Sequence, residues 1–86
     1  MAESKEHVKR ALADLGWKLQ TQDERPDAVM ANHGKYHLMI SFDDGEPTSV
    51  IVSYVGRGGA ILSAKWAGVE HLPTPKSVVR VLSKDA

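Results

Sequence analysis

The sequence has no cysteine, which excludes disulfide bonds, a thiolate nucleophile and a thiolate metal site. It also has no long hydrophobic run, because no apolar stretch approaches the about 20 residues that span a bilayer. Residues 1–6 mix acidic and basic side chains and do not form the apolar core of a signal peptide. We therefore expect a cytoplasmic protein that does not enter a membrane.

An excess of charge of either sign is lacking too. Eleven Lys and Arg residues balance eleven Asp and Glu residues, so the formal net charge is zero. This balance disfavours a protein that holds nucleic acid mainly by neutralising phosphates. It also gives little electrostatic protection against self-association. The 42% hydrophobic content over 86 residues is typical of a globular chain, and we expect a single domain over residues 1–86.

The most informative stretch is a predicted hairpin of two strands, residues 35–43 and 48–55, joined by a turn at residues 43–47. In the first strand Tyr36, Leu38, Ile40 and Phe42 alternate with more polar residues. This period of two is typical of a strand with one buried face. In the second strand the same face is supplied by Val50, Val52 and Tyr54.

Helices are predicted at both ends of the chain. Residues 4–15 carry an apolar stripe with helical spacing, preceded by a possible N-cap at Ser4 and followed by Gly16, which favours a helix end. Thr74 and Pro75 are typical of the start of a second helix. The two predicted stripes comprise Val8, Ala11, Leu12 and Leu15, and then Val78, Val81 and Leu82.

Three further strands are predicted at residues 17–22, 28–32 and 60–66, which gives the order α-β-β-β-β-β-α. The strand connections are too short for parallel crossovers, so the sheet should be an antiparallel meander. We expect an α+β two-layer sandwich with the N- and C-terminal helices on one face of the sheet. The predicted core combines the helix stripes with Tyr36, Leu38, Ile40, Phe42, Val52, Leu62 and Trp66.

The opposite face of this sheet should be polar, yet its alternating positions include several large apolar residues. Contiguous exposed apolar side chains mark interfaces, and methionine suits adaptable contacts. We therefore predict a homodimer through the open sheet face, or through the strand at residues 60–66 if that strand lies at the sheet margin. Two alternatives involve no interface. Either a helix covers this face, or the serines on it separate the apolar side chains from one another. The predicted protein-interface residues are Met30, His37, Met39, Ile51, Val55 and Ile61.

Catalytic, metal-binding and cofactor-binding motifs are not evident. The carboxylates Asp43, Asp44 and Glu46 share one turn, but the loop length and later ligands of a calcium site are missing. His33 and His37 have a helical metal spacing on a predicted turn and strand, where that spacing does not aim both at one ion. We therefore predict no catalytic residues, no metal, no cofactor and no enzyme activity.

The function expected from these features is that of a small non-catalytic protein-binding module, such as a regulator, an inhibitor or a chaperone-like protein. The alternative is a nucleic-acid-binding accessory protein. It would use a basic rim and the turn Arg57-Gly58-Gly59, whose glycines would let backbone amides converge on an anion. The anion or nucleic-acid candidates are Lys18, Lys35, Arg57 and Lys65.

Overall fold

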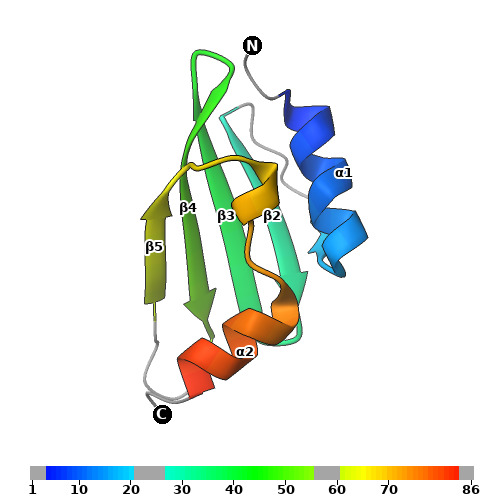
Figure 1. Cartoon of the computed structure of the whole chain (residues 1–86), viewed down its shortest axis with the longest axis vertical. Helices are drawn as coiled ribbons and strands as arrows, with labels where there is room; N and C mark the ends of the chain where they lie inside the picture. The colour runs from blue at the N-terminus through cyan, green and yellow to red at the C-terminus, as the bar shows by residue number, and fades with distance from the viewer. Residues whose placement is uncertain (1–3, 21–26, 56–60, 84–86) are drawn as a thin grey trace.

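The structure is a computed structural model that describes residues 4–20, 27–55 and 61–83. These residues form helix α1 (Lys5–Leu15), strands β1 (Lys18–Leu19), β2 (Ala28–His33), β3 (Tyr36–Asp43), β4 (Glu46–Tyr54) and β5 (Ile61–Lys65), the 3-10 turn η1 (Val69–His71) and helix α2 (Pro75–Ser83). Every strand pairs antiparallel with its sequence neighbour, so the sheet order is β1-β2-β3-β4-β5 (Figure 1). The predicted five-stranded meander is confirmed.

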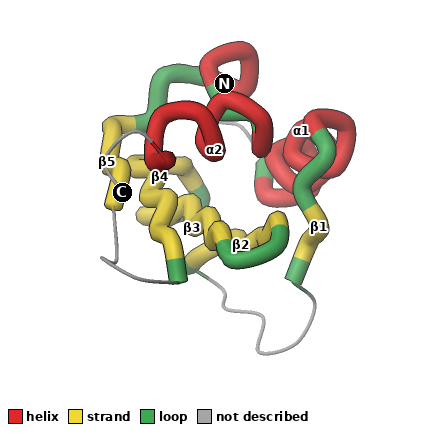
Figure 2. Tube along the Cα trace, turned by 90° about the horizontal axis from the view of Figure 1, so that it is seen from below, coloured by secondary structure: helices red, strands yellow, loops and turns green. Residues whose placement is uncertain are grey.

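Both helices lie on the same face of the sheet, as Figure 2 shows in the view from below. Between the two layers lies one hydrophobic cluster, to which α1 contributes Val8 and Leu12 and α2 contributes Val78 and Leu82. The predicted two-layer α+β sandwich is therefore correct, and the alternative with a helix on the second face is wrong.

The centre of the core is set by the register of β3 and β4. Leu38 lies opposite Val52 and Ile40 lies opposite Val50. All four side chains are buried, because residues directly opposite each other on paired strands point to the same face. Strand β2 adds Val29 and Ala31 to this surface, and Leu72 closes it from the segment before α2.

The helix ends follow the predicted capping chemistry. Ser4 Oγ accepts a hydrogen bond from the His7 backbone N–H at 3.1 Å, and Gly16 ends α1 with a φ of 105°. At the start of α2, Thr74 Oγ1 accepts from the Ser77 N–H and Ser77 Oγ accepts from the Thr74 N–H, both at 3.1 Å. This reciprocal pair satisfies two backbone donors, so Thr74 fixes where α2 begins.

Some strand boundaries differ from the prediction. The turn of the central hairpin is only Asp44-Gly45, with φ values of 54° and 81°, so β4 begins at Glu46 and not at residue 48. A register shift at Ser41/Phe42 accommodates Pro47 opposite Phe42, since a bulge tolerates a residue that cannot donate to the ladder. Strand β1 comprises only Lys18–Leu19, whereas the predicted strand was residues 17–22, of which 21 and 22 lie outside the described residues.

Two predicted core residues are in fact exposed. Leu62 on β5 is 37% exposed and Val81 on α2 is 46% exposed. The reason is where the helices lie on the sheet. Helix α2 crosses the lower end of the sheet obliquely and does not lie along β5 (Figure 1). Helix α1 packs on β1 and β2, and α2 contacts β3, so β5 lies outside the helix layer. Tyr36 and Trp66 are partly buried against the core.

Trp17 joins the two ends of the chain. Its indole is 3% exposed, and its Nε1–H donates to the Pro73 carbonyl oxygen at 2.9 Å. This bond ties the residue after α1 to the segment that leads into α2. Trp17 therefore bridges the two helical parts.

We expect Trp17→Phe to lower the free energy of unfolding by about 1–3 kcal/mol, because it leaves the Pro73 carbonyl without its donor and removes part of a buried ring. Trp66→Phe is the matched control, since Trp66 is only partly buried and its indole donates no hydrogen bond to the residues that the structure describes. Urea unfolding measured by circular dichroism gives both values. Equal losses for the two variants would contradict the role assigned to the Trp17 hydrogen bond.

Candidate protein-binding surface

The open face of the sheet carries an apolar row that crosses three strands. Met30 on β2 lies opposite Met39 on β3, and Met39 lies opposite Ile51 on β4. Each of the three is half-buried, and together with His37 and Ser53 they line a shallow hollow of about 220 Å³. The structure therefore brings together four of the six predicted interface residues.

The other two predicted interface residues lie at the margins. Ile61, at the start of β5, is 67% exposed and shares a row with Ser53. Val55 follows β4 and is 59% exposed, and its backbone N–H donates to the Lys35 carbonyl at 2.8 Å. Ser53 and Ser63 therefore separate Ile61 from the apolar row in the middle of the open face.

Strand β5 forms one margin of the sheet and pairs only with β4. The Trp66 N–H donates to the Thr48 carbonyl at 3.0 Å. Since hydrogen bonding alternates along an antiparallel strand, Leu62 and Ala64 also direct their backbone groups toward β4. Ile61, Ser63 and Lys65 direct theirs outward, where no other described strand meets them. The sequence predicted edge pairing only if this strand lies at the margin of the sheet, and β5 does lie there.

This edge lacks the usual protection against pairing with another chain. Exposed edges are commonly shortened, interrupted by proline or bulges, or charged. The opposite margin, β1, is only two residues long. By contrast, β5 has five residues, all exposed, with no proline and with a single charge at its end, Lys65. Of the two marginal strands, β5 is therefore the more exposed one for pairing with a strand of another chain.

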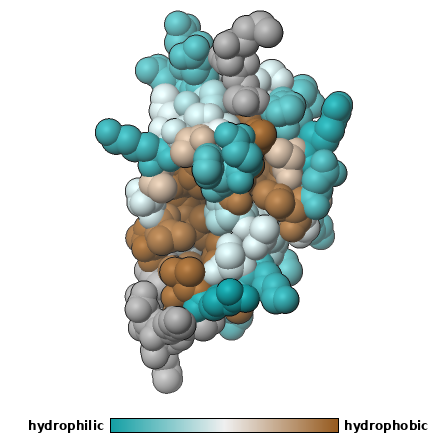
Figure 3. Space-filling model, in the orientation of Figure 1, coloured by the Kyte–Doolittle hydropathy of each residue, from teal (hydrophilic) through white to brown (hydrophobic). Residues whose placement is uncertain are grey.

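An apolar groove lies beside β5 on the helix side of the sheet. Its volume is about 200 Å³, and it runs between β5 and the segment around η1. In Figure 3 hydrophobic surface gathers at the lower left, over β5 and the adjoining end of α2. The groove is lined mainly by Val50, Val52, Leu62, Ala64, Trp66, Leu72 and Pro73.

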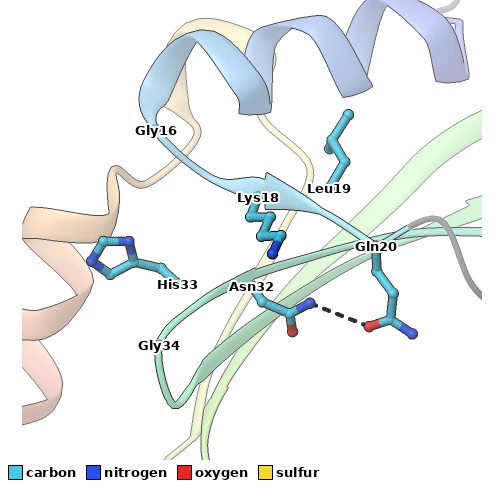
Figure 4. A pocket seen from close by; sticks show the side chains of 7 residues that line it. All are labelled: Gly16, Lys18, Leu19, Gln20, Asn32, His33 and Gly34. Atoms are coloured by element: carbon cyan, nitrogen blue, oxygen red, sulfur yellow. Dashed lines mark hydrogen bonds between the residues drawn. The ribbon is translucent and has the colours of Figure 1, made fainter.

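A larger and more polar hollow, of about 640 Å³, lies beside β1 and the end of β2 (Figure 4). Asn32 Nδ2 donates to Gln20 Oε1 at 3.4 Å, and Lys18 lies on the same side. Leu19 points toward α1, while the His33 ring points away from Gln20 toward the segment near α2. The polar groups do not converge on one point, and the lining residues include neither a carboxylate nor a hydroxyl.

The basic residues predicted for an anion site are not brought together. Lys18 is on β1 and Lys65 is on β5, at opposite margins of the sheet. Four strand spacings separate these margins, or about 19 Å. Lys35 lies in the turn between β2 and β3, and Arg57 with its two glycines falls outside the described residues.

The candidate metal ligands are also dispersed. Within residues 4–20, 27–55 and 61–83, no group of three or more His, Asp or Glu side chains is placed to hold a metal ion. His33 stands edge-on to the buried Trp17, with ring centroids 6.4 Å apart, whereas His37 is on the open face. The two histidines therefore lie on opposite faces of the sheet.

The sequence did not identify Leu62 and Ala64 as surface residues, because their alternation is that of a strand with an inner face. No local pattern in the sequence distinguishes a marginal strand that a helix covers from one that is left uncovered.

Comparison with protein-family models, with curated proteins and with solved structures gave no match. Among the described helices, none has the length and apolar character needed to cross a membrane.

We expect Met39→Ser to lower the free energy of unfolding by less than about 1 kcal/mol, because this side chain is only half-buried on the open face. Leu38→Ala on the adjacent position should cost about 2–5 kcal/mol, because that side chain is 1% exposed. Chemical unfolding of both variants tests which face is the core. Similar losses would show that the open face is covered in the folded protein.

Proposed function

We propose that this protein is a non-catalytic protein-binding module that acts through its sheet, with a partner polypeptide adding a strand to β5. The exposed, five-residue edge of β5 is the observation that carries this proposal. Strand addition suits a regulator, an inhibitor or a chaperone-like protein, since each of these must hold a segment of another chain.

Backbone groups supply the affinity in this mode of binding. Ile61, Ser63 and Lys65 each offer one N–H and one C=O to an incoming strand. Each hydrogen bond formed contributes about 0.5–1.5 kcal/mol net. The apolar groove beside Leu62 and Ala64 supplies specificity, because alternate side chains of the added strand would point into it.

The open face is the weaker of the two surfaces. Its row of Met30, Met39 and Ile51 is half-buried by neighbouring side chains, so further burial would remove less apolar area from water. The rows beside it are rich in serine, at Ser41, Ser49 and Ser53. In the proposed function the open face makes secondary contacts, and β5 makes the primary ones.

The test is strand addition to variants of Ser63. Peptides selected from a displayed library of short random sequences are measured by fluorescence anisotropy. Ser63→Pro removes an outward N–H and leaves the hydrogen bonds to β4 in place, so we expect the affinity to fall by about tenfold or more, or at least about 1.4 kcal/mol. Ser63→Ala keeps the donor and should bind like the wild type.

Circular dichroism and thermal unfolding confirm that both Ser63 variants are folded. Met39→Asp should retain most of the peptide affinity. The proposal would be overturned if Ser63→Pro bound as tightly as the wild type, or if no selected peptide depended on β5. Loss of binding in Met39→Asp alone would assign the site to the open face instead.

A further inference from the structure

We propose that the strand added to β5 is the β5 of a second copy, paired antiparallel in a register centred on Ser63. This inference rests on the proposed function and names the partner at that site. It joins two five-stranded sheets across a two-fold axis that is perpendicular to the sheet.

The backbone restricts the registers available. Residues that face outward on one copy must meet outward residues on the other, and these are Ile61, Ser63 and Lys65. Only one such register overlaps all five residues of β5 with all five of its copy. It places Ser63 opposite Ser63, Ile61 opposite Lys65, and Leu62 opposite Ala64.

Side-chain sizes fit this register on the helix side of the sheet. A large residue, Leu62, then faces a small one, Ala64, twice across the axis. Ala64 lines the apolar groove, so the Leu62 side chain of the second copy would lie over it and fill that space. Leu62 is 37% exposed in one copy, and this contact would bury much of that surface.

The side chains on the open face of the sheet are also compatible with this register. Ser63 and its copy are small, so the two strands can approach closely, and their hydroxyls can hydrogen-bond across the axis. The register centred on residue 65 would instead place two lysines directly opposite, which is destabilising. Because the formal net charge of the chain is zero, two copies have little overall repulsion to overcome.

The contact is small, and this limits its strength. A single pair of five-residue strands buries less than the about 1,600 Å² of a typical stable interface. We therefore expect a reversible dimer with a Kd on the order of 100 μM, set by the backbone ladder and by Leu62. Sedimentation equilibrium across this concentration range should show a mass that rises from monomer to dimer.

Single cysteines report the register, since the chain has no cysteine of its own. In Ser63→Cys the two Cα atoms would lie about 5.5 Å apart, which is within disulfide range. In Lys65→Cys they would be about 14 Å apart along the strands. Under mild oxidation of concentrated protein we expect a covalent dimer from the first variant and at least tenfold less from the second.

A size exchange tests the Leu62–Ala64 contact. Leu62→Ala opens a void and Ala64→Leu overfills the groove, so each should weaken dimerisation about tenfold. The double variant restores one large and one small residue at each pair, and its Kd should return to within about threefold of the wild type. Both positions are exposed, so the fold is retained, as thermal unfolding can verify.

Three results would overturn the second-copy inference. They are a monomeric wild type throughout, equal cross-linking at residues 63 and 65, or a double variant no better than the single ones. A monomer that still binds selected peptides through β5 would leave the proposed function intact and remove only the second copy. Failure of both dimerisation and peptide binding would remove both.

Discussion

The placement of the two helices on the sheet is the constraint on which the rest of the structure depends. Helix α1 lies along the β1–β2 side, whereas α2 crosses the lower end of the sheet obliquely (Figure 1). Because α1 packs on β1 and β2 while α2 reaches β3, the uncovered strip falls at β5. The exposure of Leu62 and the groove beside it both follow from that placement.

The register set by a tight hairpin determines which residues point to each face of the sheet. The Asp44-Gly45 turn occupies positive φ at both residues, which sets how β3 and β4 align. A shift by one residue would carry Leu38 and Ile40 to the open side and Met39 to the core. Burial of the four central residues of β3 and β4 therefore also determines that Met30, Met39 and Ile51 form one row on the open face.

Features determined by local chemistry were predictable from the sequence. Ser4, Gly16 and Thr74 mark helix ends because their side chains or backbone freedom act within one turn. The alternation from Tyr36 to Phe42 predicted the buried face of β3. The strand order also followed, because short connections allow only neighbouring antiparallel pairs.

Features determined by the packing of distant elements were not predictable in the same way. Leu62 has the alternation of an inward residue, and Val81 has helical spacing with Leu82, yet both are exposed. Their burial depends on where α2 rests on the sheet, and no local pattern encodes this. Met30, Met39 and Ile51, which were predicted as interface residues, do share one row because register alone places them there. That Ala64 lines a groove follows only from the packing beside it.

An unprotected strand edge ordinarily invites open-ended aggregation, so the two margins of this sheet have to be considered together. In the proposed dimer, β5 pairing with its own copy would use the long edge of both molecules. Among the described residues, each end of the joined sheet would then carry β1 and the part of β2 that β1 does not cover. Strand β1 has two residues, too few to template another chain. A two-fold joint of this kind is closed, so association stops at two copies. In the proposed arrangement the edge of β5 would therefore be available to a single partner strand at a time.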